Sequence, residues 1–538
     1  MALCKVTIDG QQIEVDSSKS IIEAAELLNK NIPHFCWHPK LSVSGNCRMC
    51  LVEVEKMPKL VIACMTPVMD GMNVTTNNSR VINAREAVME FILINHPLDC
   101  PICDEAGECK LQDYAFSHSS GQSRFTENKN HKPKRVEIGP RVLFDAERCI
   151  TCSRCIRFCD EIAGVHQLQF VNRGDRVTIE TFPGKSLDNP YSMNVVDICP
   201  VGALTNRDFR FKSRVWELTY TDSICVGCSR GCNIEVASRN NEILRFTPRQ
   251  NDDVNSFWMC DNGRVNSFKF VNDESRISEP KFDKNNISWD DSFEIAKNEI
   301  KKYKSSEIGF IASAFATNED NFILRKLIAE KFPNSYVTSF DYKIVGDEDK
   351  ILIKEDKTPN SNGVKLIFNG FKSYISPNDF ISKVNSGEIK FIYSIDEHSL
   401  EKVSKANFII SHSTNSDKNA NLVFSSSTFA EVSGTITNFQ NRIQRLRPAI
   451  LTNEIENYST ETEQSRWEKF KAANDRWGKG NKRNSKQNWK IIQLFANAIG
   501  SKIKYNSSED VFKELTETNP SFKNLTYLKI GKLGIQLN

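Results

Sequence analysis

All 17 cysteines of the chain lie in its first half, between Cys4 and Cys260, and residues 261–538 contain none. Cysteines used only as small apolar residues would be scattered along the whole chain. The N-terminus has no apolar secretory signal, so we expect a reducing compartment, where thiols serve as metal ligands more often than as disulfides. The clustering therefore predicts a metal-binding half followed by a half of a different kind.

The first cysteine set contains a C-x2-C pair between two long spacers: Cys36, Cys47, Cys50 and Cys64. This pattern resembles plant-type 2Fe–2S ferredoxins, although their first spacer is shorter. Upstream, β-rich runs at 3–8 and 11–15 predict a hairpin, and a capping box at Ser20 predicts a helix to about Asn29. We therefore expect a 2Fe–2S cluster on a β-grasp domain, with a zinc site as the alternative.

The second set combines a histidine with three closely spaced cysteines: His96, Cys100, Cys103 and Cys109. His96 follows a predicted helix at 79–95, which Pro97 ends, so His96 could simply interact with the helix dipole. The three thiolates, however, lack a fourth partner that His96 is placed to supply. A neutral imidazole in place of a thiolate removes one negative charge and raises the reduction potential, as in Rieske centres.

The third set is a compact C-x2-C-x2-C-x3-C run followed by a distant cysteine: Cys149, Cys152, Cys155, Cys159 and Cys199. The run is typical of bacterial 4Fe–4S ferredoxins, in which the fourth cysteine serves a second cluster. No second C-x2-C-x2-C run lies near Cys199, so the expected ligands are Cys149, Cys152, Cys155 and Cys199. Cys159 precedes Asp160 instead of proline and is interpreted as a buried thiol.

The fourth set places three cysteines in one loop and a fourth after a β-rich stretch: Cys225, Cys228, Cys232 and Cys260. This spacing suits another 4Fe–4S cluster, and zinc is a stronger competitor here than at the first set. Cys4 stands alone in the first predicted strand and is interpreted as a small apolar residue.

The rest of the composition narrows the class of protein. The net charge is +3, which gives no electrostatic case for nucleic-acid binding. No apolar run approaches the roughly 20 residues of a membrane-spanning helix, so we expect any membrane attachment to go through partners.

Beyond about residue 280 the pattern is that of an α/β domain. Short apolar runs at 308–311, 366–368, 391–393 and 408–410 predict buried parallel strands, and 319–332 predicts a helix between them. This half contains neither a GxGxxG motif nor a P-loop, so the sequence predicts no nucleotide site.

The segments HFCWHPKLSVSGNCRMCLVEVE, HPLDCPICDEAGECKLQDYAF and RCITCSRCIRFCDE closely resemble the large iron–sulfur subunit of respiratory complex I, which is the G subunit of NADH:quinone oxidoreductase. The resemblance covers residues 1 to about 275. It implies a 2Fe–2S cluster at 36–64, a His-ligated 4Fe–4S cluster at 96–109 and a 4Fe–4S cluster at 149–199. The set at 225–260 is similar to an additional cluster of bacterial members that lies off the main path.

The second half resembles the molybdopterin oxidoreductase fold through residues 427–438, 441–444, Pro448 and 488–492. In catalytic relatives this region helps to hold the pterin. The half is short for a molybdenum enzyme and offers no cysteine to the metal, so the resemblance implies a vestigial domain without molybdopterin.

The expected fold class is α+β followed by α/β, in five domains. These are a β-grasp 2Fe–2S ferredoxin domain (1–78), a 4Fe–4S domain with histidine and cysteine ligands (79–118), a bacterial-type 4Fe–4S ferredoxin domain (141–212), a 4Fe–4S domain like the N-terminus of molybdenum and tungsten oxidoreductases (217–273), and the molybdopterin-oxidoreductase-like domain (280–538). Residues 118–140 are interpreted as a linker.

The resemblance implies an electron-transfer subunit of complex I without a catalytic site of its own. It implies flavin-bearing, NADH-oxidising partners and quinone-side iron–sulfur partners, and a peripheral place on the cytoplasmic face of a bacterial inner membrane. The alternatives are a diaphorase subunit of a soluble NAD-linked hydrogenase, a formate dehydrogenase, and a zinc-stapled scaffold. The long second half argues against the hydrogenase subunit.

Overall fold

The computed structural model describes residues 3–416, 419–454 and 482–537, so parts of the predicted domains 1–78 and 280–538 lie outside the described residues. The chain divides into two compact units, Met1–Trp216 and Glu217–Asn538. The first unit contains the first three cysteine sets, and the second unit contains the fourth set together with the whole cysteine-free half.

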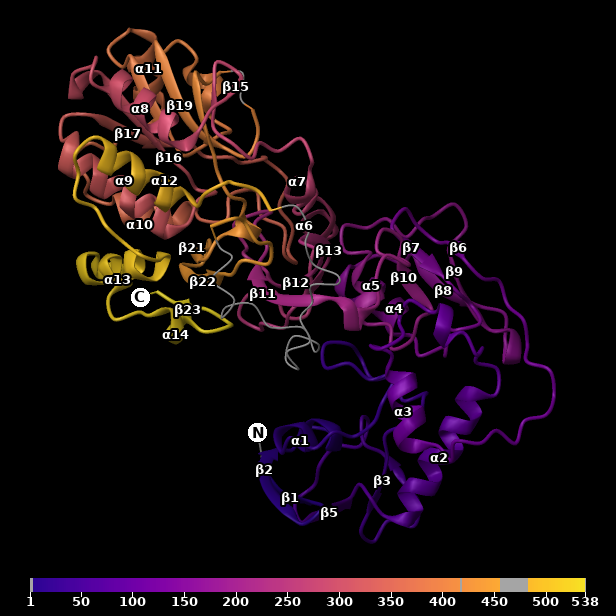
Figure 1. Ribbon diagram of the computed structural model, residues 1–538. Helices are drawn as coiled ribbons and strands as arrows, with labels where there is room; N and C mark the ends of the chain where they lie inside the picture. Colours follow the sequence, from indigo (N-terminus) through magenta and orange to yellow (C-terminus); the bar gives the residue numbers. More distant parts are fainter. Residues whose placement is uncertain (1–2, 417–418, 455–481, 538) are drawn as a thin grey trace. The chain divides into compact units, whose positions relative to one another are not determined.

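The first unit begins with a mixed five-stranded sheet, coloured indigo in Figure 1, in the order β2-β1-β5-β3-β4. Its elements are β1 (Leu3–Ile8), β2 (Gln11–Asp16), α1 (Ile21–Leu27), β3 (Leu51–Val54), β4 (Val61–Ile62) and β5 (Met72–Thr75). β1 and β2 form the predicted hairpin, and β5 runs parallel to β1. Ser20 and Glu23 form the predicted capping box. Cys4 packs in the core of this sheet, as a small apolar residue does.

Two neighbouring helices, α2 (Ser79–Leu93) and α3 (Lys110–His118), follow the sheet and flank a short 3-10 turn, η1 (Cys100–Ile102). Residues 119–135 contain no helix or strand, in agreement with most of the predicted linker 118–140, but residue 118 ends α3 and residues 136–137 form β6. The remainder of the first unit consists of short elements around the third cysteine set. They are β6 (Val136–Glu137), β7 (Val142–Phe144), α4 (Arg154–Arg157), the π-helical turn η2 (Phe158–Ile162), β8 (Leu168–Val171), β9 (Thr178–Thr181), α5 (Asn194–Asp197) and β10 (Leu204–Asn206).

The second unit starts with three antiparallel strands, followed by two short helices. They are β11 (Thr219–Ile224), β12 (Asn233–Arg239), β13 (Glu242–Pro248), α6 (Asp261–Asn266) and α7 (Lys269–Asn272).

A seven-stranded sheet forms the centre of the second unit. In spatial order its strands are β15 (Asn285–Asn286), β14 (Lys281–Phe282), β20 (Leu422–Ser425), β19 (Phe408–Ser413), β18 (Phe391–Ser394), β16 (Ile308–Ala312) and β17 (Tyr336–Ser339). The strands from β20 to β17 are mutually parallel, and β14 is antiparallel to β20. The strands predicted at 308–311, 391–393 and 408–410 are confirmed.

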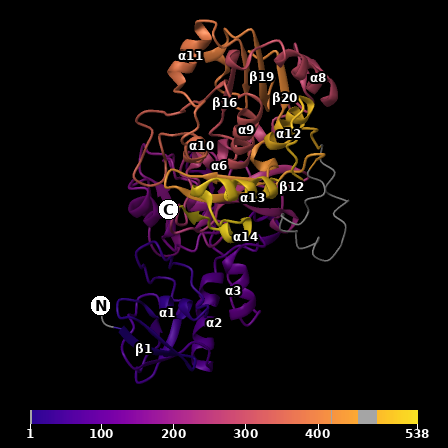
Figure 2. The same ribbon diagram turned by 90° about the vertical axis from the view of Figure 1, so that its left-hand side faces the viewer.

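Helices cover both faces of this sheet. Successive residues of a strand point to opposite faces, so neighbouring apolar residues of one strand pack against different helices. Phe310, Tyr393 and Ile410 pack with α8 (Trp289–Ile300), α9 (Asn318–Lys331), α10 (Ser361–Phe368) and α12 (Asn488–Ala498). The neighbouring residues on the other face pack against α11 (Pro377–Asn385) and η6 (Leu400–Val403). Figure 2 shows α11 and α8 on opposite sides of the strands. The helix predicted at 319–332 is α9.

The strand predicted at 366–368 is wrong, because these residues form the end of α10. Val364, Ile367 and Phe368 are the buried apolar side chains of this helix, at the spacing of one helical face. A run of three apolar residues fits a buried strand or a helix turn equally well, and the upstream Val364 decides in favour of the helix.

The second unit ends with three antiparallel strands and two helices: β21 (Gly434–Thr437), β22 (Arg442–Leu446), α13 (Ser508–Thr518), α14 (Tyr527–Ile530) and β23 (Ile535–Gln536). None of the helices that the structure describes is long and apolar enough to cross a membrane.

Candidate metal centres

Hydrogen bonds between side chains link the four cysteines of the first set in a row, from Cys47 to Cys36, from Cys36 to Cys64 and from Cys64 to Cys50. Cys36, Cys50 and Cys64 are almost fully buried, and the residues between α1 and β3 form an irregular loop around them. Hydrogen bonds from the Cys47 and Cys64 thiols lower the pKa of Cys36. Contact with Cys36 and Cys50 raises the pKa of Cys64. The structure thus brings all four predicted ligands together.

The second set lines a cavity beyond the end of α2. His96, Cys100, Cys103 and Cys109 all face this cavity, together with Arg148 and Gly202. Cys100 begins η1 and is exposed, whereas Cys109 is the N-cap of α3. The four predicted ligands therefore surround one space.

His96 has the chemical features of a metal ligand. Its ring Nδ1 is buried and has no hydrogen-bond partner among the described residues. Burial lowers the pKa of His96 to about 4, so the imidazole is neutral at pH 7, which is the form that binds metals. A buried nitrogen without a partner costs free energy unless another group binds it, so a metal ligand at this position fits the site.

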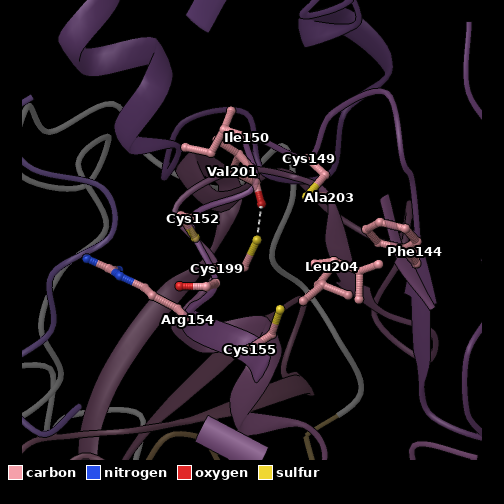
Figure 3. A pocket seen from close by; sticks show the side chains of 12 residues that line it. Phe144, Cys149, Ile150, Cys152, Arg154, Cys155, Cys199, Val201, Ala203 and Leu204 are labelled. Carbon is pink, nitrogen blue, oxygen red and sulfur yellow. Dashed lines mark hydrogen bonds between the residues drawn. The ribbon is translucent and has the colours of Figure 1, made fainter. Parts of the chain in front are cut away.

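The third set surrounds an enclosed cavity, where the sulfurs of Cys149, Cys152, Cys155 and Cys199 converge (Figure 3). Cys155 lies in α4 and Cys199 follows α5, while Thr151 and Ser153 adopt left-handed backbone conformations that turn the loop between them. Burial raises the pKa of the Cys149 thiol to about 12, and it also raises the pKa values of the Cys155 and Cys199 thiols well above their usual range. Four thiolates this deeply buried need a compensating positive charge, which a metal cluster supplies.

Cys159 is fully buried in η2 and does not line this cavity. Its burial raises the pKa of its thiol to about 12. The location agrees with a buried thiol, although the role of Cys159 stays a prediction.

A single loop separates the second cavity from the third. Cys199 lines the third cavity and Gly202 lines the second. The carbonyl of Pro200 lies 3.9 Å from Sγ of Cys109. A Cβ atom at Gly202 would lie 2.2 Å from Sγ of Cys103, so only glycine allows this close approach.

Direct hydrogen bonds join the loops of the first and third sets. Arg157 donates to the carbonyls of both Cys36 and Cys152. Asn46 Nδ2 donates to the carbonyl of Thr151 at 3.0 Å. The third set therefore contacts the first set on one side and the second set on the other.

Two buried arginines accompany the cavities, and sequence reasoning missed both. Arg148 lines the second cavity and forms an ion pair with Asp99 at 2.9 Å. Arg154 lines the third cavity and donates to the carbonyl of Ile198 at 3.0 Å. Their charges favour the thiolate form of nearby cysteines. The available signal was their position, adjacent to Cys149 and Cys155 respectively.

The fourth set lies in the second unit, between β11 and α6. Burial raises the pKa of Cys225 to about 12 and that of Cys260 to about 11. The backbone amide of Gly263 donates to Sγ of Cys260 at 3.3 Å, and a Cβ at Gly263 would lie 2.9 Å from Sγ of Cys225. The glycine thus lets two predicted ligands approach the start of α6. Burial and the negative charges of Cys225, Cys228 and Cys260 raise the pKa of Cys232, so the four predicted ligands lie near one another.

Within residues 3–416, 419–454 and 482–537, no three His, Cys, Asp or Glu side chains are placed to hold a single metal ion. A cluster makes a different demand on the chain, because each of its protein ligands binds an iron atom of the cluster and not one shared ion.

Four family models match the chain, in sequence order. A 2Fe–2S iron–sulfur cluster binding domain matches residues 2–79, and a NADH-ubiquinone oxidoreductase-G iron–sulfur binding region matches 85–124. The ferredoxin-like domain of NADH-quinone oxidoreductase subunit 3 matches 139–205. A NADH-ubiquinone oxidoreductase NDSU1/NuoG-like 4Fe–4S domain matches 218–267. The comparisons therefore confirm iron–sulfur domains at the first, second and fourth cysteine sets and a ferredoxin-like domain at the third.

Curated relatives include G subunits of NADH-quinone oxidoreductase, the family that the sequence resembles. The G subunit of NADH-quinone oxidoreductase from Rickettsia bellii is 42% identical over 349 residues, which cover 64% of this chain and 50% of the relative. Its counterpart from Rickettsia conorii is 42% identical over 64% of this chain and 51% of its own length. The mitochondrial NADH dehydrogenase [ubiquinone] iron–sulfur protein 1 of Solanum tuberosum is 40% identical over 62% and 45%. The chain thus spans about half the length of the curated relatives it matches.

Among solved structures, a chain of an NAD+-reducing [NiFe]-hydrogenase in the H2-reduced state matches with a TM-score of 0.36 and 27% identity. The match covers 39% of this chain and 91% of that chain.

Proposed function

We infer that this chain, which belongs to the family of NADH-quinone oxidoreductase G subunits, is an electron-transfer subunit of complex I. It would receive electrons from flavin-bearing, NADH-oxidising subunits and pass them toward quinone-side iron–sulfur subunits. It would lie at the cytoplasmic face of a bacterial inner membrane as a peripheral subunit, with no substrate site of its own.

The observation that carries this proposal is the contact between successive ligand sets. Arg157 and Asn46 join the first set to the third, and the loop from Cys199 to Gly202 separates the third from the second. Electron transfer between redox centres requires such closeness and no substrate pocket. The order first, third, second differs from the order in sequence.

Iron–sulfur clusters supply one-electron transfer when they are bound, and the chain sets how they do so. We propose a 2Fe–2S cluster at the first set and 4Fe–4S clusters at the other three, with the following ligands: Cys36, Cys47, Cys50 and Cys64; His96, Cys100, Cys103 and Cys109; Cys149, Cys152, Cys155 and Cys199; Cys225, Cys228, Cys232 and Cys260. Apolar side chains such as Phe144 and Leu204 keep water from the third cavity. The guanidinium groups of Arg148 and Arg154 offset negative charge on the thiolates.

For the cysteine-free half we propose a vestigial molybdopterin-oxidoreductase-like domain that holds no pterin. The mixed α/β architecture of the second unit and the absence of cysteine after Cys260 support this proposal. We further propose that the chain consists of five domains, at residues 1–78, 79–118, 141–212, 217–273 and 280–538.

The test is purification of the tagged chain, under anaerobic conditions, from membranes of its own organism. We expect it within a large NADH–quinone oxidoreductase assembly. Once separated anaerobically from the other subunits, the chain should carry about 14 iron atoms, from one binuclear and three four-iron clusters. NADH should generate several distinct electron paramagnetic resonance (EPR) signals. Zinc without paramagnetic signals would refute cluster binding, and a soluble assembly with hydrogenase activity would refute the assignment to complex I.

A further inference from the structure

The second unit contains a cavity of about 460 Å³ at one edge of its parallel sheet. Its lining includes the residues that directly follow four adjacent strands: Ser313 after β16, Ile395 after β18, Thr414 after β19 and Ser426 after β20. In open parallel sheets, ligands bind outside the carboxyl ends of the strands. The volume lies within the range of small-molecule sites.

Aromatic side chains line this cavity at two places. The Phe315 and His398 rings lie 4.7 Å apart, edge to face, and Phe270 and Phe429 form a second pair at 6.0 Å. Such rings offer flat apolar surfaces against which a planar heteroaromatic ring can stack.

Two carboxylates follow β18 and line the cavity, and Glu397 offers a hydrogen-bond acceptor. Oε2 of Glu397 accepts from the Thr414 backbone amide at 2.8 Å and from the Ser413 hydroxyl, which fixes the side chain at the cavity. Within the part of the chain that the structure describes, Oε1 of Glu397 accepts one hydrogen bond, from the Thr414 hydroxyl at 3.2 Å. Asp396 lies beside it and is held by the Tyr342 hydroxyl at 2.9 Å. A carboxylate after a strand is the group that binds ribose hydroxyls in doubly wound sheets.

The charges of the lining disfavour a ligand with many phosphates. The ammonium group of Lys357, which also lines the cavity, is paired with Asp347 at 2.6 Å. Asp396 and Glu397 contribute negative charge, and the sequence contains no glycine-rich phosphate loop. A nearly neutral ligand with hydroxyl groups fits better than a nucleoside triphosphate.

We propose that this cavity binds a purine nucleoside, with its base against Phe315 and His398 and its ribose hydroxyls on the carboxylate of Glu397. The proposal does not depend on the electron-transfer function. The lining includes Ser427 and Asn488, from the stretches that resemble molybdopterin oxidoreductases, and Gly227 from the loop of the fourth cysteine set.

The first experiment is isothermal titration calorimetry of the purified, full-length chain with adenosine, guanosine, 2′-deoxyadenosine and ATP. We expect saturable binding of one purine nucleoside per chain, with about tenfold weaker binding of the 2′-deoxy form, because the deoxy form lacks a hydrogen bond to a charged group. No saturable binding of adenosine or of guanosine, or tighter binding of ATP, would overturn the proposal. Mass spectrometric detection of a pterin in an acid extract would also overturn it.

The second experiment locates the site by substitution. Glu397→Gln should weaken adenosine binding about tenfold and remove the preference over 2′-deoxyadenosine, because an amide nitrogen would replace an acceptor. Glu401→Gln changes an exposed glutamate in η6 and is the matched control. Unchanged affinity in Glu397→Gln would refute the ribose contact.

A further variant covers the possibility that Glu397→Gln fails to fold. The His398 side chain is half-exposed, so His398→Ala should preserve the fold. It should weaken adenosine binding about threefold to tenfold through the loss of a stacking surface. Equal affinities of wild type and His398→Ala would place the nucleoside elsewhere and refute the proposal.

Discussion

The second and third candidate centres share a wall, which is the loop from Cys199 to Gly202, yet they differ in ligand type and exposure. The third cavity is lined by four thiols and apolar side chains, and Cys152 and Cys155 are buried. The second cavity is lined by three thiols and His96, and its Cys100 is exposed. Each cavity also has one buried arginine in its lining, Arg154 or Arg148. The arginines differ in their partners, because Arg148 is paired with Asp99 whereas Arg154 donates to a backbone carbonyl. The ligand set and the access of water differ as well, and both bear on the reduction potentials of the proposed clusters.

Charge and hydration act in the same direction in this pair. Replacing a thiolate by a neutral imidazole removes one negative charge from the second centre and favours its reduced state. Access of water to Cys100 also stabilises the more negative, reduced state. We therefore expect the second centre to have the higher reduction potential of the two, which favours electron transfer from the third centre to the second.

The largest effect should come from breaking the all-thiolate site. In Cys155→Ser we expect loss of the third cluster, because a buried hydroxyl is a poor iron ligand. Iron analysis should show about four fewer atoms per chain, and the corresponding EPR signal should vanish. Cys4→Ser, which changes a buried cysteine outside the four sets, is the control and should keep its iron. Full iron content in Cys155→Ser would contradict the ligand assignment.

The shared wall itself can be altered by Gly202→Ala. The new methyl group would lie 2.2 Å from Sγ of Cys103 and must displace that ligand or its loop. We expect the EPR signal of the second centre to broaden or disappear while that of the third remains. Gly184→Ala is the control, because its new methyl group would have no atom within 4 Å. Residue 184 has a left-handed φ of +75°, so this control also reports the effect of backbone strain at an alanine. If the EPR signals of both centres are unchanged in Gly202→Ala, the loop at residue 202 can move away from Cys103 without disturbing the second centre.

The ligand difference is tested by His96→Cys. We expect the second cluster to be retained with a reduction potential lowered by roughly 100 mV or more, because a thiolate adds a negative charge to the cluster. The measurement is an EPR-monitored redox titration of the purified protein, in which the third centre serves as an internal reference. Equal midpoint potentials in wild type and variant would mean that His96 is not a ligand.

Sequence reasoning succeeded where the determining pattern is local. The hairpin at β1 and β2 and the capping box at Ser20 depend on neighbouring residues, and the structure contains both. The run 366–368 was misassigned because three apolar residues do not distinguish a helix from a strand. The five-residue stretch from Val364 to Phe368 within α10 carries the missing information.

Spacing predicts which residues belong to the second and third sets, and the structure places each set around one cavity, but no spacing predicts that the two cavities are adjacent. The contact between Gly202 and Cys103 joins residues about 100 positions apart in the chain. The bonds from Arg157 to the first set span a similar separation. Such contacts arise from packing of whole segments, so no local spacing reports them. Cys159 presents the converse case, because its spacing matches a ligand pattern although it lies outside the cavity.

The smallest effect is therefore expected for Cys159→Ala. Its thiol is buried in η2 and absent from the cavity lining, so the variant should keep all cluster signals and its iron content. Removal of a buried sulfur should lower the free energy of unfolding by only about 1 kcal/mol, because the cavity left behind is small. EPR spectroscopy and thermal unfolding of the anaerobic protein measure both quantities. Loss of the third signal, with the second retained, would make Cys159 a ligand and would require one of the four cysteines that line the cavity to be released from the proposed set.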